Sequence, residues 1–85
     1  MNISKYEQRV LHVLAQGGAI HVQRLANGKV GDIACMTRDG HKLSDCTYAV
    51  FDRLRKWKLI RSMNGRPYRI TRRGLGAVRA QLDNR

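Results

Sequence analysis

The chain has few acidic residues, one proline, two cysteines and no long hydrophobic run. Each of these shortages argues against a class of protein or a kind of structure. It holds 6 Asp and Glu against 17 Lys and Arg in 85 residues, a formal net charge of +11. A single proline and an apolar content of 42% favour one globular domain over a disordered chain. Two cysteines allow at most one disulfide, and we expect both Cys35 and Cys46 to be thiols in a reducing cytosol. Without a long apolar stretch, we expect a cytoplasmic protein with no signal peptide and no membrane contact.

The positive charge is concentrated in the C-terminal part of the chain. Residues 1–52 carry six basic and five acidic side chains, whereas residues 53–85 carry eleven basic side chains and one acidic side chain, Asp83. Such an asymmetry within one small domain predicts a positive face, for which polyanions are the natural partner. A basic surface that merely keeps the protein in solution is the alternative interpretation.

A helix is predicted near the N-terminus. Ser4 and Glu7 have the spacing of a capping box, which predicts a helix beginning near Lys5, and Gly17-Gly18 is expected to end it. The side chains expected on its buried face are Tyr6, Val10, Leu11 and Leu14.

Strands are predicted next, because the apolar period changes to two after Ala19. Asn27-Gly28 supplies a two-residue turn, and residues 30–36 are again rich in β-forming residues. Gly31 is expected to form a bulge that corrects the register, and residues 41–43 are expected to add a short third strand.

A second helix is predicted from Asp45 to Trp57, with Ser44-Asp45 as its cap. The residues expected on its core face are Thr47, Val50, Phe51, Leu54 and Trp57. The opposite face carries Tyr48, Asp52, Arg53, Arg55 and Lys56, which predicts the first strongly basic helix surface of the chain.

A hairpin and a third helix complete the prediction. The hairpin starts at Leu59-Ile60, turns at Asn64-Gly65 and returns through residues 68–70. Thr71 is expected to cap the last helix. Its inward side chains are expected to be Leu75, Val78 and Leu82.

The predicted fold is therefore a single α+β domain, residues 1–85, with a winged-helix-like order α-β-β-(β)-α-β-β-α. It departs from a helix-turn-helix, because a β-meander replaces the usual second helix. The predicted ligand is nucleic acid, with duplex DNA preferred. The expected contact residues are Arg53, Arg55, Lys56, Lys58, Arg61, Arg66, Tyr68, Arg69, Arg72 and Arg73.

The chain also resembles a known family, the YjhX family of small bacterial toxins of toxin–antitoxin pairs. The stretches that carry the resemblance are "EQRVLHVLAQGG", "DCTYAVFDRL", "KLIRSMNGRPYRIT" and "VRAQLDNR". The resemblance implies a cytoplasmic protein that harms the cell when free. It also implies an antitoxin protein encoded nearby, acetyltransferase-like, that neutralises it. It supplies no catalytic motif to transfer to these residues.

Catalysis and metal binding find little support in the spacing of reactive residues. Cys35, His41 and Cys46 match no common zinc pattern, so we expect neither metal nor cofactor. One enzymatic alternative stays open: a small ribonuclease in which His21 and His41 meet across the sheet near basic side chains. A basic module that binds an acidic protein partner is the other alternative.

Overall fold

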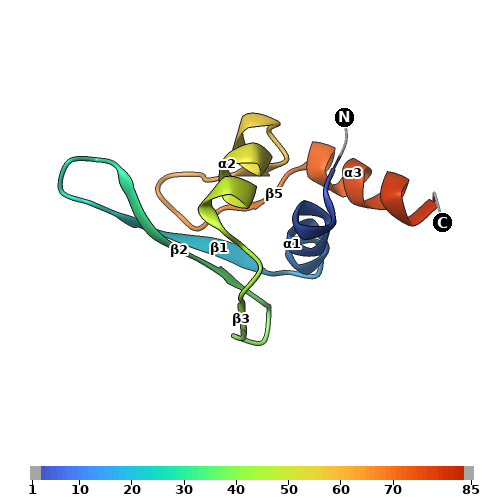
Figure 1. Ribbon diagram of the computed structural model, residues 1–85, viewed down its shortest axis with the longest axis horizontal. Helices are drawn as coiled ribbons and strands as arrows, with labels where there is room; N and C mark the ends of the chain where they lie inside the picture. The colour runs from blue at the N-terminus through green and yellow to red at the C-terminus, as the bar shows by residue number, and fades with distance from the viewer. Residues whose placement is uncertain (1–2, 84–85) are drawn as a thin grey trace.

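A computed structural model describes the backbone of residues 3–83 and the side chains of residues 3–78. Its elements are α1 (Lys5–Ala15), β1 (Ala19–Arg24), β2 (Val30–Met36), β3 (Lys42–Leu43), α2 (Tyr48–Lys56), β4 (Ile60–Arg61), β5 (Arg69–Ile70) and α3 (Arg72–Asp83). β1, β2 and β3 form one antiparallel sheet in that order, and β4 and β5 form a second (Figure 1). The α+β class is therefore confirmed. None of the described helices is long and apolar enough to span a bilayer.

The capping box predicted for α1 is present. The Ser4 hydroxyl accepts a hydrogen bond from the Glu7 amide at 3.4 Å, and the Glu7 carboxylate accepts one from the Ser4 amide at 2.9 Å. The helix ends before Gly17, whose φ of +102° suits glycine. The prediction for Tyr6 is wrong, because its side chain is exposed rather than on the buried face.

The predicted bulge lies in the β1–β2 hairpin. Val22 pairs with Ile33 and Arg24 with Val30, so one residue of β1 opposes two residues of β2, Gly31 and Asp32. A Cβ at Gly31 would lie 3.0 Å from the Leu25 side chain, so glycine suits this position. The expected third strand forms as β3, which pairs with the end of β2.

Helix α2 begins later than predicted. Thr47 is its N-cap and accepts a hydrogen bond from the Val50 amide at 3.4 Å, whereas Ser44-Asp45 was expected to cap it. The Asp45 carboxylate pairs with Arg9 of α1 instead. The following Cys46 is buried in the core.

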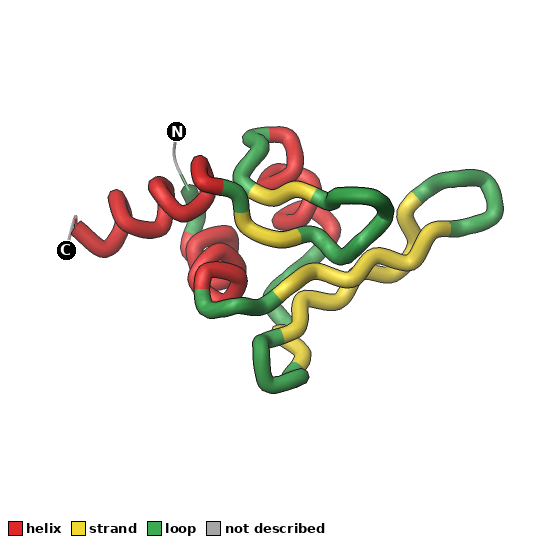
Figure 2. Tube along the Cα trace, turned by 180° about the vertical axis from the view of Figure 1, so that it is seen from behind, coloured by secondary structure: helices red, strands yellow, loops and turns green. Residues whose placement is uncertain are grey.

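The two sheets are joined at one point. Ile20 and Tyr68 exchange two main-chain hydrogen bonds of 2.9 and 2.8 Å, which places β5 beside β1. The β4–β5 hairpin turns through Asn64 and Gly65, which have φ values of 55° and 74° as a tight two-residue turn requires. Figure 2 shows that both hairpins point their turns to the same side, away from α1 and α3.

The core lies between α1, α2 and the strands. Phe51 is fully buried and packs edge-to-face on Tyr68, with ring centroids 5.0 Å apart. α3 adds Val78, but the prediction for Leu75 is wrong, because this side chain is 39% exposed. Gly74 faces inward instead, and the predicted inward Leu82 lies outside the described side chains. The other buried hydrophobic residues are Val10, Leu11, Leu14, Ala19, Ile20, Cys35, Cys46, Val50, Leu54, Leu59 and Ile60.

Candidate nucleic-acid interface

The basic side chains of α2 are held in ion pairs. Arg55 and Lys56 lie 2.6 and 3.0 Å from the carboxylate of Asp52. Lys56 and then Arg55 hold the pKa of Asp52 below its ordinary value. Arg53 lies 2.9 Å from Glu7 of α1. The helix face that the sequence predicted to be strongly basic is therefore largely balanced by two carboxylates.

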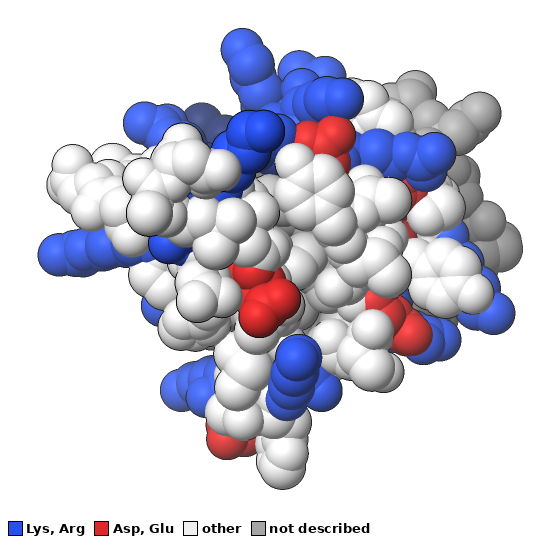
Figure 3. Space-filling model, turned by 60° about the vertical axis from the view of Figure 1, so that its left-hand side comes forward, with Lys and Arg blue, Asp and Glu red and all other residues white. Residues whose placement is uncertain are grey.

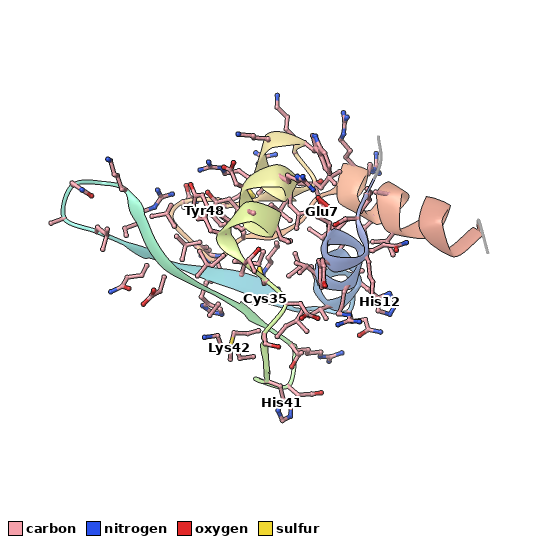
Figure 4. All side chains as sticks on the ribbon, in the orientation of Figure 1. Glu7, His12, Cys35, His41, Lys42 and Tyr48 are labelled. Atoms are coloured by element: carbon pink, nitrogen blue, oxygen red, sulfur yellow. The ribbon has the colours of Figure 1, made fainter. Side chains whose placement is uncertain are left out.

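Glu7 is the one buried charged residue among the described side chains. Burial would raise its pKa, but hydrogen bonds from the Ser4 hydroxyl, from Arg53 and from the Ser4 amide outweigh that effect and lower it. Figure 4 shows Glu7 between α1 and α2, which it joins. Arg53 is thus part of the structure that fixes these two helices.

The basic residues that follow α2 are in a different situation. Six of them are exposed and form no salt bridge among the described side chains: Lys58, Arg61, Arg66, Arg69, Arg72 and Arg73. No Asp or Glu occurs between Asp52 and Asp83. Figure 3 shows Lys and Arg crowded along the upper edge of one face and further Lys and Arg at its other edges, where acidic side chains also lie. The longest stretch of exposed cations with no acidic residue in the sequence around it therefore lies in the β4–β5 hairpin and the first turn of α3.

Two hollows connect five of these six residues, and Arg72 lies next to Arg73 in the chain. The first has a volume of about 340 Å³ and is lined by Arg61, Arg66 and Arg69 together with the exposed Met63. The second, of about 490 Å³, brings Lys58 and Arg73 to Arg61. We call the surface formed by the six exposed cations the basic hairpin surface.

Arg61 and Arg69 lie directly opposite each other in the β4–β5 ladder. The neighbouring pair, Ile60 and Ile70, has the opposite orientation, and Ile60 is buried. Like charges at opposed positions of a sheet destabilise it by roughly 0.2–1 kcal/mol. The hairpin therefore keeps two cations together at a cost in stability, which is typical of a binding surface rather than of a solvated one.

Tyr68 was predicted to contact nucleic acid, and the structure places it in the core. It is 9% exposed, packs on Phe51, and its main chain joins the two sheets. This burial leaves it almost no surface to stack on a base. We therefore leave Tyr68 out of the basic hairpin surface.

The histidines do not come together as a catalytic pair. His21 lies on β1 and His41 in the turn before β3, with β2 between these strands, and the described hollows that contain His21 do not contain His41. Figure 4 shows His41 at the end of the molecule beyond β3. In residues 3–78, no three His, Cys, Asp or Glu side chains are grouped so that they could hold a metal ion.

Both cysteines are free thiols, as predicted, and both are buried. A hydrogen bond with Cys35 and burial raise the pKa of the Cys46 thiol. A protonated, buried thiol is a poor nucleophile. Both side chains lie in the hydrophobic core cluster, so the pair belongs to the core packing.

One part of this arrangement was readable in the sequence and another was not. Asp52 precedes Arg55 and Lys56 by three and four residues, the spacing at which helix side chains pair, so this signal was present. The pair of Glu7 and Arg53 joins residues 46 positions apart. No local pattern indicates it.

The fold and the surface define a class of protein: a small α+β domain whose positive charge is densest over a C-terminal hairpin. The chain belongs to the YjhX toxin family, whose model, described as "Putative toxin of bacterial toxin-antitoxin pair", matches residues 1–85. The resemblance predicted from the sequence is thereby confirmed, and membership implies an antitoxin partner.

Similar proteins are found across several bacteria. The chain is 62% identical over 85 residues to a UPF0386 protein of Parvibaculum lavamentivorans and 60% identical to one of Beijerinckia indica, both covered in full. A UPF0386 protein of Caulobacter vibrioides is 59% identical, with all of this chain and 93% of that protein covered. No solved structure matches the chain.

Proposed function

We propose that this member of the toxin family acts in the cytoplasm by binding duplex DNA through the basic hairpin surface, without catalysis. The observation that carries the proposal is the set of six exposed cations that have no acidic partner among the described side chains. Toxicity follows if such binding blocks the use of the DNA. Its antitoxin, a protein that we expect to be acetyltransferase-like, neutralises it.

The arrangement of the strands supports a winged-helix-like use of this surface. β1 follows α1 and is joined to β5, which pairs with β4, so the hairpin occupies the place of the wing. α2 precedes the hairpin as a recognition helix would, and β2 and β3 stand where a second helix usually lies. The proposed fold is a winged helix with a β-meander inserted.

The ion pairs of α2 change which residues we expect to contact DNA. Arg55 and Lys56 share Asp52, and Arg53 is held by Glu7, so these cations already have partners. The hairpin arginines are the better candidates for phosphate contacts. Phosphate contacts position a protein on DNA but carry no sequence information, so we expect binding with little sequence preference.

The test is a salt titration of binding to a fluorescently labelled duplex. Each phosphate contact contributes about 0.9 to the slope of log K against log salt, so Arg66→Ala with Arg69→Ala should reduce the slope by about 1.8. The matched control is Lys29→Ala with Arg38→Ala, which removes two exposed cations from the other turns. Equal slopes for the wild type and the hairpin variant would overturn the proposal.

The wild type and a histidine variant distinguish DNA binding from the two alternative functions. Cleavage of total RNA that disappears in the folded His21→Ala, His41→Ala variant would replace DNA binding by the ribonuclease function. If the wild type binds no duplex at low salt but binds an acidic protein, the acidic-partner interpretation takes its place.

A further inference from the structure

A slot opens where the β4–β5 hairpin leaves β1. Ile20 and Tyr68 exchange two main-chain hydrogen bonds, and the residue that would continue the ladder opposite Val22 is Arg66, two positions before Tyr68. The amide of Arg66 donates to Met63 within the hairpin turn at 3.1 Å, and its carbonyl accepts from the Ser62 hydroxyl. The main-chain groups of Arg66 are therefore hydrogen-bonded within the hairpin, which turns away from β1.

The edge of β1 continues beyond this point without a partner. Alternate residues of an antiparallel strand point their main-chain groups to the same side. Because both groups of Ile20 point to Tyr68, those of Val22 point to the same side. In the described part of the chain no strand pairs with Val22 there. An amide donor and a carbonyl acceptor are thus presented at an open edge.

This edge faces a cavity of about 270 Å³. One wall comes from β1 with His21, Val22 and Arg24, and the other from the hairpin with Arg66 and Pro67. Two arginines and one histidine line it, and none of its lining residues is acidic. Arg24 is exposed and forms no salt bridge among the described side chains.

We propose that this slot binds an extended acidic segment of a partner protein, which adds a strand to β1 at Val22 and places carboxylates at Arg24 and Arg66. Strand addition of this kind uses main-chain hydrogen bonds for affinity and side-chain contacts for specificity. The segment takes the place opposite Val22 that Arg66 would occupy if the hairpin continued along β1.

The pairing of one main-chain donor and one acceptor at Val22 favours a peptide ligand over a nucleic acid. A peptide strand offers a carbonyl to the Val22 amide and an amide to the Val22 carbonyl. A phosphodiester backbone carries only acceptors at its phosphates, so it would leave the carbonyl without a donor. The slot shares Arg66 with the basic hairpin surface, but Val22 and Arg24 lie outside that surface, so the inference does not rest on the proposed DNA function and is tested at Arg24.

The test is an NMR titration of the ¹⁵N-labelled protein with acetylated, amidated hexaglutamate at neutral pH and constant ionic strength. We expect shift changes centred on residues 20–24 and 66–68, and slower amide exchange at Val22. The control peptide is hexaglutamate methylated at alternate backbone nitrogens, which keeps the charge but removes donors and should bind at least tenfold more weakly.

Arg24→Gln should weaken hexaglutamate binding by about twofold to fivefold, as expected for an exposed ion pair, and leave the salt slope with duplex DNA unchanged. Arg38→Gln is the matched control and should change neither the hexaglutamate binding nor the salt slope with duplex DNA. Equal binding of both peptides would overturn strand addition, as would the absence of shifts at residues 20–24. Stronger shifts there with a thymidine hexanucleotide than with hexaglutamate would assign the slot to nucleic acid instead.

Discussion

Adding one methyl group at either of two glycines of α3 should change stability in opposite directions. A Cβ at Gly74 would lie 2.4 Å from the carbonyl oxygen of Leu59 and 2.6 Å from the side chain of Ile70. A Cβ at Gly76 would meet nothing within 4 Å. Both positions lie in the helix, so Ala gains about 1 kcal/mol of helix propensity over Gly at each.

At Gly74 the steric clash determines the sign of the change in the free energy of unfolding. Overpacking a well-packed contact costs about 1–3 kcal/mol, and the upper end applies here because one of the two clashing atoms is main chain. Gly74→Ala should therefore lower the free energy of unfolding by about 2 kcal/mol, whereas Gly76→Ala should raise it by up to about 1 kcal/mol. In a domain of this size, these values correspond to a Tm about 8–16 °C lower and up to about 8 °C higher.

Thermal and urea unfolding followed by circular dichroism measure both variants against the wild type. A shift of Tm in the same direction and by similar amounts in both variants would contradict a clash at Gly74. That result would mean that α3 does not approach Leu59 as closely as the structure shows.

Three further predictions concern the core, the buried carboxylate and the hairpin. Leu54→Ala, at a fully buried position, should destabilise the protein by about 2–5 kcal/mol in urea unfolding, and an unchanged midpoint would contradict the packing of α2. The lowered pKa of Glu7 adds stability that is present above its ordinary value of 4.5 and is lost as the pH falls through the lower folded value. Urea unfolding from pH 7 to 3 should show a smaller acid loss in Glu7→Gln than in the wild type, and parallel curves would refute it. Arg69→Gln should raise the free energy of unfolding by about 0.2–1 kcal/mol at low salt by removing the repulsion from Arg61. This gain should shrink in high salt, and a loss of stability would show that the arginine packs favourably.

The elements that local chemistry determines were predictable from the sequence. The capping box of Ser4 and Glu7 and the turn at Asn64-Gly65 depend only on residues a few positions apart, and both are present. The bulge at Gly31 was also predictable, because the apolar period slips by one residue there.

The wrong predictions have tertiary causes. Thr47 caps α2 in place of Asp45, whose carboxylate pairs with Arg9, 36 positions away in the chain. Leu75 is exposed because Gly74 brings the backbone of α3 close to Leu59, which rotates the helix relative to the expected face. Neither effect leaves a mark in a local pattern.

The candidate site was predictable in outline only. The charge count located the excess cations after Asp52, but it could not tell which of them the fold neutralises. The burial of Glu7 and of Tyr68 removes one arginine and one aromatic ring from the expected surface.

The unequal distribution of charge also gives the molecule an electric dipole. The first 52 residues carry six basic and five acidic side chains, whereas residues 53–85 carry eleven basic and one acidic, and the cations of the hairpin and the start of α3 have no partners in residues 3–78. In the field of a polyanion such a molecule rotates before contact, so that many encounters begin with the hairpin foremost. Orientation before contact speeds association, and it weakens once salt shortens the screening length to below the size of the domain.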